Sequence, residues 1–313
     1  MSPILLTTLC LACAATATPA RQKALLFSSF RGNGEDGLHL AFSRDGLRWE
    51  ALNGDRPLLA PTAGGKLMRD PQIARGPDGT FHMVWTTAWE KQGVGYASSK
   101  DLIHWSEQRL LPVMDAEPAC RNVWAPELVY DPGAKRWLIY WSSTIPGRFP
   151  ETEKAGDDGY NHRIYGCETA DFATFTPTRL LFDPGFNCID ATIVRDGRRW
   201  LMFLKDETRN PPAKRIHWTS APHASGPYDR AVSPAITGDY WAEGPTAIKL
   251  DGHWRVYFDR YMDGRYGMVS SKDLREWQEA PAADVRFPQG MRHGSVLEVP
   301  EAVLQGLVRL GGG

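Results

Sequence analysis

Three acidic residues recur where the sequence repeats itself. Asp70, Asp190 and Glu243 each precede a short apolar, β-branched run, and a fourth run of this kind follows Ala125. Two carboxyl groups flanking a glycosidic bond can hydrolyse it, because one protonates the leaving oxygen while the other activates water or attacks carbon. A third carboxylate raises the proton affinity of the acid by like-charge repulsion. One such acid alone is usually a turn or strand cap, but three in corresponding places suggest a shared site.

The units that carry these acids have the pattern of β-hairpins. In the unit of Glu243, residues 243–250 form an expected strand, Asp251-Gly252 is a tight-turn signal, and residues 253–258 are rich in aromatic and β-branched residues. A Ser-x-Asp phrase followed by an aromatic residue closes the units, as at residues 43–49, 99–105 and 271–277. The units recur at intervals of roughly 50–65 residues, which is typical of β-propeller blades.

The two ends of the chain complete the count of blades. Four units are headed by the three acids and by Ala125, and half-units remain in residues 24–50 and 292–299. Pairing these halves in one sheet would make a fifth blade and cover its open edges. No helical periodicity is sustained, which disfavours a βαβ architecture. We therefore predict an all-β, five-bladed β-propeller whose last blade is closed by N- and C-terminal strands, with the acids around its axis.

Composition and the N-terminus narrow the class of protein. The 313 residues include 36 basic and 37 acidic side chains, so no basic surplus points to nucleic acid. Residues 4–15 form an apolar run too short to span a bilayer, and Ala15-Thr16-Ala17 suits signal peptidase. We expect a signal peptide over residues 1–20, a secreted or periplasmic protein, and one catalytic propeller domain over residues 21–313. No other apolar stretch is long enough for a membrane-spanning helix.

Three cysteines lie beyond the expected signal peptide, at Cys120, Cys167 and Cys188. An odd number allows at most one disulfide, and the sequence does not decide whether one forms. Residues 21–313 contain no Cys-x-x-Cys motif, so a zinc ribbon is unsupported. Buried, inert thiols are the favoured interpretation.

Several segments resemble glycoside hydrolase family 43, over nearly all of residues 24–299. They are Arg69-Asp70-Pro71, Ile189-Asp190 and Trp241-Ala242-Glu243-Gly244-Pro245, in that order, with Trp124-Ala125-Pro126-Glu127 and Arg292-His293-Gly294. The resemblance implies a five-bladed propeller and an inverting glycosidase acting mainly on arabinose- and xylose-containing glycans. It further implies that Asp70 is the general base, Glu243 the general acid and Asp190 the pKa modulator. More residues precede Asp70 than in many members of the family, and we assign them to the last blade.

Other residues near the blade ends are candidates for contact with the substrate. Trp89, Trp124 and Trp241 could each place an apolar face under a sugar ring, and Trp241 is preferred because it is nearest in sequence to the acid. Arg292 could hydrogen-bond a sugar hydroxyl or form a salt bridge with one of the acids. His293 matches a family position that faces calcium or water in the axial channel. A satisfied core histidine is the alternative, because calcium prefers oxygen ligands.

The sequence leaves the substrate open. Arabinofuranosyl, xylosyl and galactofuranosyl groups of plant-type polysaccharides or oligosaccharides all fit, since specificity depends on rim loops such as residues 145–163 and 205–215. The chemistry requires no cofactor, and a structural calcium remains an open alternative. A retaining fructan or sucrose hydrolase would carry Asn-Asp-Pro-Asn and Glu-Cys segments, which the chain lacks. A non-catalytic sugar-binding propeller would keep similar residues in every blade. Exo or endo action and oligomeric state stay undecided.

Overall fold

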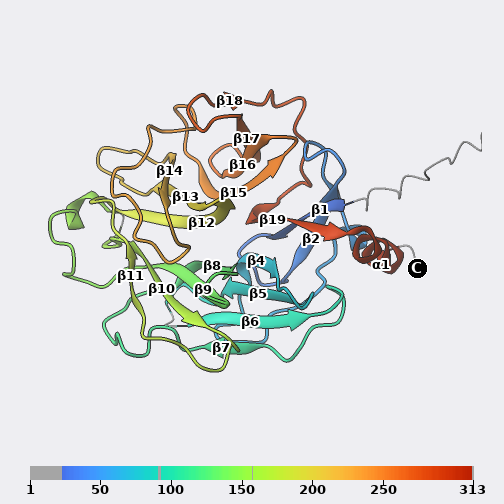
Figure 1. Cartoon of the computed structure of the whole chain (residues 1–313), viewed down its shortest axis with the longest axis horizontal. Helices are drawn as coiled ribbons and strands as arrows, with labels where there is room; N and C mark the ends of the chain where they lie inside the picture. The colour runs from blue at the N-terminus through green and yellow to red at the C-terminus, as the bar shows by residue number, and fades with distance from the viewer. Residues whose placement is uncertain (1–22, 91–92, 157, 312–313) are drawn as a thin grey trace, which may run out of the picture.

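The computed structural model describes residues 23–90, 93–156 and 158–311, and its strands form five antiparallel sheets around a central axis (Figure 1). The expected signal peptide lies outside the described residues. Four sheets follow one another along the chain, each with its first strand innermost. Their strands are β4 (Arg69–Arg75), β5 (Phe81–Thr86), β6 (Val94–Ser99) and β7 (Arg109–Leu111); β8 (Trp124–Asp131), β9 (Arg136–Ser143), β10 (Arg163–Thr169) and β11 (Arg179–Phe182); β12 (Cys188–Asp196), β13 (Arg199–Asp206) and β14 (Ile216–Ala221); and β15 (Glu243–Leu250), β16 (His253–Arg260), β17 (Arg265–Ser271) and β18 (Gln278–Glu279).

The fifth sheet joins the two ends of the chain. Its order is β19 (Arg292–Pro300), β1 (Lys23–Phe30), β2 (His39–Ser43) and β3 (Glu50–Ala51). Leu26 pairs with Leu297, and the hydroxyls of Ser28 and Ser295 lie 3.0 Å apart. The strand closest to the axis therefore comes from the C-terminal part, and the N-terminal strands complete the sheet outward. This confirms the predicted five-bladed propeller and the way it closes.

The innermost strand of every blade carries the same bulge near its start. In β4, Arg69 pairs with Thr86 and Gln72 pairs with Val84, so β4 has one residue more than β5 between the two pairs. Arg69 is the first residue of this bulge and Asp70 the second. The register of β8, β12, β15 and β19 shifts in the same way. In four blades the second residue of the bulge has a positive φ, with 51° at Asp70, 45° at Ala125, 56° at Asp190 and 58° at Gly244. A bulge of this kind turns side chains toward the end of the axial channel.

The bulge corrects one part of the sequence analysis. Glu243 was placed in the same position of the repeat as Asp70 and Asp190. In the structure Glu243 pairs with Asp259 at the first bulge position, and Gly244 occupies the place that corresponds to Asp70. The three acids therefore stand on two adjacent levels, because Glu243 lies one residue earlier in its strand.

The Ser-x-Asp phrase at the outer end of the blades is a structural turn. Asp101 Oδ1 accepts hydrogen bonds from the backbone N–H groups of Ile103 (2.9 Å) and His104 (2.8 Å). The same pattern recurs at Asp45, Asp171 and Asp273. A side chain that satisfies two backbone donors explains why the phrase repeats.

One helix was not expected from the sequence. Two short 3₁₀ turns, η1 (Asn53–Asp55) and η2 (Glu153–Ala155), lie in loops, and α1 (Glu301–Gly311) follows β19 directly. The helix buries Leu304 and Leu307 against the fifth blade. Its start is held at the surface, where Arg44 donates to Glu301 Oε1 at 2.6 Å. Eleven residues with two glycines give only a short apolar repeat, which is why no sustained helical period was visible.

The hydrophobic core is divided among the interfaces between blades. Each cluster of buried apolar side chains combines residues of neighbouring sheets, as where Phe27 of β1 contacts Tyr257 of β16. The three described cysteines are buried thiols, and burial raises the pKa of Cys167 to about 12. None of the helices that the structure describes is long and apolar enough to cross a membrane.

Candidate active site

A cavity of about 250 Å³ opens where the five innermost strands begin. Its wall contains the first bulge residue of every blade and the second bulge residue of three of them. Charged groups therefore meet from blades that are far apart in the sequence. The charged residues supplied by the bulges are Asp70, Asp190, Glu243, Arg69, Arg292 and His293.

Asp70 is held as a carboxylate at this cavity. Its side chain is 11% exposed, accepts a hydrogen bond from Thr86 Oγ1 at 2.8 Å, and lies 3.3 Å from His293 Nδ1. Burial alone would raise the pKa of this carboxyl. The charge and hydrogen bond of His293, with Arg69 and Thr86, outweigh burial and lower the pKa of Asp70 to about 2. A permanently ionised carboxylate can accept a proton from water.

Asp190 and His293 share the centre of the site. His293 Nδ1 lies 4.0 Å from Asp190 Oδ2, which also accepts a hydrogen bond from the backbone N–H of Gly244 at 3.0 Å. Burial, with the nearby charges of Glu243 and Asp70, raises the pKa of Asp190 to about 6. Burial would lower the pKa of His293, but attraction to Asp190 and Asp70 raises it to about 9. At neutral pH the histidine is therefore the cation between two acids.

Gly244 is required by the close packing of His293. A Cβ atom added at this position would stand 2.4 Å from Cγ of the imidazole ring, and the φ of 58° already favours glycine. The Glu-Gly-Pro sequence thus serves two purposes, since it places an acid at the cavity and leaves room for the histidine beside it.

Glu243 is held between two cations. Arg292 Nη2 donates to Oε1 at 3.1 Å, and Lys205 Nζ donates to Oε2 at 3.2 Å. Arg292 also donates from Nε to Asp259 Oδ2 at 2.8 Å, so the salt-bridge alternative considered for this arginine is present, and its side chain still lines the cavity. Burial, followed by repulsion from Glu243, raises the pKa of Asp259 to about 6.

The comparison with known protein families agrees with this geometry. A family model described as a probable glycosyl hydrolase domain, related to glycoside hydrolase family 43, matches residues 21–304. The chain belongs to this glycosyl hydrolase family. The resemblance inferred from the acid-headed repeats is thereby confirmed.

Individual relatives of this glycosyl hydrolase are distant. An α-L-arabinofuranosidase of Bifidobacterium longum subsp. longum is 22% identical over 356 aligned residues, which cover 90% of this chain and 33% of that protein. The chain thus spans about a third of the length of the curated relative it matches. A thermostable family-43 glycoside hydrolase superposes with a TM-score of 0.56 at 16% identity, covering 76% of this chain and 82% of that one. An α-L-arabinofuranosidase from Lactobacillus brevis gives 0.52 at 18%, covering 68% and 72%. These structural likenesses establish the fold.

Aromatic side chains form two parts of the cavity wall in this glycosyl hydrolase. Trp89 and Trp124 lie edge to face with ring centroids 5.4 Å apart, and Trp89 is 47% exposed. On the other side the wall is made by Tyr261, whose ring centroid is 6.0 Å from that of Trp241. Trp241 is not among the residues that line the cavity, although it was the preferred platform. Tyr261 lines the cavity near Trp241, and no feature of its sequence neighbourhood had singled it out.

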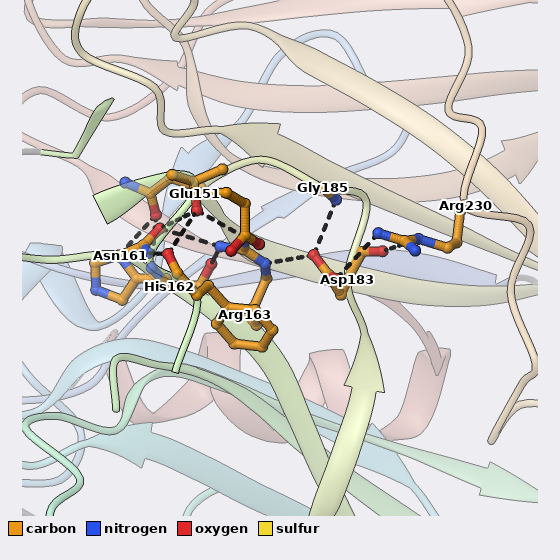
Figure 2. A network of polar contacts seen from close by, with 10 residues as sticks. Glu151, Asn161, His162, Arg163, Asp183, Gly185 and Arg230 are labelled. Atoms are coloured by element: carbon orange, nitrogen blue, oxygen red, sulfur yellow. Dashed lines mark hydrogen bonds and ion pairs between the residues drawn. The ribbon is translucent and has the colours of Figure 1, made fainter. Parts of the chain in front are cut away.

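The first rim loop is fixed by a buried arginine (Figure 2). The Arg163 side chain is fully buried, and its Nε donates to Asp183 Oδ1 at 2.5 Å while Nη2 donates to Thr152 Oγ1 at 2.9 Å. The guanidinium also lies 4.2 Å from the centroid of the Phe149 ring. Asp183 in turn contacts Arg230 at 3.1 Å, which ties the loop to the next blade.

This loop contacts the cavity wall at Trp124, whose ring lies against the rings of both Tyr160 and His162. The ring of Tyr160 stacks on His162 and lies 4.6 Å from the ring of Trp124, centroid to centroid. His162 is fixed by Asn187, whose Oδ1 accepts from the His162 backbone N–H at 2.7 Å. The loop thus supports a wall residue from behind, and the second rim loop contributes Glu207 to the wall itself.

A calcium ion beside His293 stays a prediction. Nδ1 of the histidine faces Asp70 at 3.3 Å, so this nitrogen already has a carboxylate partner. Within residues 23–90, 93–156 and 158–311, no group of three or more His, Cys, Asp or Glu side chains is arranged to hold a metal ion.

Glu207 and Lys205 are the charged groups that sequence reasoning missed. Lys205 is the penultimate residue of β13 and contacts Glu207 at 2.6 Å as well as Glu243. Glu207 also contacts Lys214 at 2.5 Å. Sequence analysis assigned residues 205–215 to a rim loop. The strand in fact continues through Asp206, and this places the Lys205 ammonium inside the site. Its partner Glu243 is 38 positions away, so no local motif could have revealed the pair.

Proposed function

We propose that the chain is an inverting glycoside hydrolase that removes arabinofuranosyl or xylosyl groups, with galactofuranosyl as a further candidate, from plant-type polysaccharides or oligosaccharides. The observation that carries this proposal is that Asp70 and Glu243 line one cavity but have different charged neighbours. His293 keeps Asp70 ionised, whereas Glu243 belongs to a separate set of ion pairs. A base and an acid with distinct environments are what displacement by water requires.

The proposed reaction needs one water molecule and two carboxyl groups. Asp70 accepts a proton from water as the water oxygen bonds to the anomeric carbon. The glycosidic bond breaks with its electron pair on the leaving oxygen, which takes the proton of Glu243. Asp190 orients the centre through the backbone N–H of Gly244 and through His293. Attack opposite to the leaving group inverts the anomeric configuration.

The wall suits a neutral sugar with several hydroxyl groups. Trp89 offers an exposed aromatic face, and Tyr261 and Trp124 form apolar surfaces elsewhere in the wall. Sugar rings pack on such faces through their C–H groups, while Arg292 and Glu207 can hydrogen-bond hydroxyls. The B. longum relative, an α-L-arabinofuranosidase, supports arabinofuranosyl as the first group to test. Export through residues 1–20, to the periplasm or outside the cell, remains part of the proposal.

A panel of chromogenic aryl glycosides tests the activity. We expect release of the chromophore from aryl α-L-arabinofuranoside or aryl β-D-xyloside by the wild-type protein, and near-complete loss in Asp70→Asn. The matched control is Glu127→Gln, which removes a carboxylate outside the cavity wall. No release from any glycoside, or equal activity in Asp70→Asn, would contradict the proposal.

A further inference from the structure

Six charged side chains of alternating sign run past the cavity. Asp259 contacts Arg292, Arg292 contacts Glu243, and Glu243 contacts Lys205. The row continues through Glu207 to Lys214. The candidate acid therefore stands in the middle of a row of ion pairs, not alone in an apolar pocket.

Lys205 is the cation of this row whose one charged nitrogen is shared between two carboxylates. Its side chain is 2% exposed, and Nζ lies 2.6 Å from Glu207 Oε2 and 3.2 Å from Glu243 Oε2. The ammonium also lies 4.8 Å from the ring centroid of Tyr261. Burial would lower the pKa of Lys205, but attraction to Glu207 and Glu243 holds it well above its usual range, so the cation persists. Burial would likewise raise the pKa of Glu207, but Lys205 and Lys214 lower it.

Arg292 cannot play the same part, because its other nitrogen is fixed. Nε donates to the buried Asp259 at 2.8 Å, and a guanidinium keeps its proton at any working pH. The remaining charges that face Glu243 are Asp190 on β12 and His293 on β19. Lys205 differs because its single charged nitrogen meets both acids, and it lies closer to Glu207 than to Glu243.

We propose that Lys205 and Glu207 are positioning residues that set when Glu243 carries its proton. Lys205 favours the ionised carboxylate of Glu243, and Glu207 limits that effect by drawing the ammonium toward itself. The proposal rests on the proposed function, in which Glu243 must be protonated to release the leaving group. By this proposal, Lys205 and Glu207 control the pH range in which Asp70, Asp190 and Glu243 work together.

The pH profile of kcat/KM tests this proposal, because replacing Lys205 and replacing Glu207 should shift its alkaline limb in opposite directions. In Lys205→Met the positive charge is lost, so Glu243 keeps its proton to higher pH and the alkaline limb should move up by about one pH unit or more. In Glu207→Gln the lysine keeps one carboxylate partner, so the limb should move down. Lys205→Arg retains the charge and should bring the limb back toward the wild-type position. Lys249→Met is the matched control, because Lys249 lies on β15 like Glu243 but pairs with Asp196 outside the cavity, and it should leave the alkaline limb unchanged.

A second measurement does not depend on turnover. The carboxyl carbon of Glu243, assigned by its absence in Glu243→Gln, can be titrated by ¹³C NMR in each variant. We expect its midpoint at higher pH in Lys205→Met and at lower pH in Glu207→Gln. Unmoved midpoints, or movement in the same direction in both variants, would overturn the proposal. If the midpoints move as expected but Glu243→Gln keeps full activity, the charge pair stands and the role of Glu243 as the acid fails.

Discussion

Asp70 and Glu127 are two largely buried carboxyl groups in the same axial channel, on neighbouring innermost strands. Asp70 lies 3.3 Å from the imidazole of His293, and its pKa falls to about 2. Glu127 accepts a hydrogen bond from the hydroxyl of Tyr140 at 2.7 Å, and burial raises its pKa to about 7. Burial is similar in the two cases, so the neighbouring group decides whether the acid is charged. The imidazolium beside Asp70 keeps that carboxyl ionised, and the phenol beside Glu127 does not offset the effect of burial.

The two acids also belong to different levels of the innermost strands. Glu127 lies where strand pairing resumes after the bulge, the position that Gln72 and Thr246 occupy in their own strands. Side chains at this position bind the neighbouring innermost strand. Gln72 Oε1 accepts a hydrogen bond from Leu128 N at 3.0 Å, and Thr246 Oγ1 accepts one from Val296 N at 3.1 Å. This lower level joins the blades to one another. The first and second positions line the cavity and carry the charges. One repeated bulge therefore supplies both the contacts that join the blades and the charged residues of the candidate site.

The sharpest test of this contrast is to neutralise each acid in turn. Asp70→Asn should lower kcat/KM by about 10²–10⁴-fold on every substrate, because water is no longer activated. Glu127→Gln should retain activity within a few-fold, because its carboxyl lies outside the cavity wall. Added azide should restore turnover of activated aryl glycosides by Asp70→Asn alone. Comparable losses of kcat/KM in Asp70→Asn and Glu127→Gln would contradict the distinction between the cavity residues and the residues that join the blades.

Replacement of Glu243 should separate substrates by their leaving groups. In Glu243→Gln, glycans with poor leaving groups should lose most of their turnover, since nothing protonates the departing oxygen. Activated aryl glycosides need little protonation and should lose far less. Rates measured over a series of aryl leaving groups should show a steeper dependence on the pKa of the leaving phenol. A uniform loss across the series would argue against the acid role.

His293→Gln should change both activity and the pH dependence of stability. The folded-state pKa of His293 is about 9, above the ordinary value of 6.5. Its stabilising contribution is therefore fully present below about pH 6.5 and is lost as the pH rises through about 9. Thermal unfolding should show a wild-type decline over this window that is weaker in the glutamine variant. Loss of the cation should also shift the acidic limb of kcat/KM to higher pH, since Asp70 would hold its proton more tightly. Parallel stability curves for the two proteins would contradict this account.

Glu127→Gln should give the smallest effect, seen only in stability. Because the folded-state pKa of Glu127 is about 7, the folded protein holds a proton that the unfolded chain releases near pH 4.5. Wild-type stability should therefore fall as the pH rises from about 4.5 to 7. The uncharged, isosteric variant should be flatter across that range in denaturant titrations. An equally steep curve in the variant would show that Glu127 is not held neutral.

The sequence predicted what depends on repetition, and missed what depends on contacts between distant residues. Four acid- or alanine-headed hairpins were enough to predict the blades and the pairing of the two chain ends. The offset of Glu243 was missed because the acids were aligned, and not the prolines that lie inside the bulge. Asp70-Pro71, Ala125-Pro126 and Gly244-Pro245 share the same bulge geometry and would have shown the offset. Lys205 and Tyr261 gave no signal, because each enters the site from the end of a second strand or the turn beyond it.

The stereochemistry of hydrolysis tests the central claim most directly. If Asp70 activates water while Glu243 protonates the leaving oxygen, the two carboxyls leave room for that water, a separation of roughly 6.5–9.5 Å. ¹H NMR of the first-formed sugar, recorded before mutarotation, should then show the anomeric configuration opposite to that of the substrate. A first product with retained configuration would mean that one carboxylate attacks carbon, and it would contradict the assignment of Asp70 as a general base.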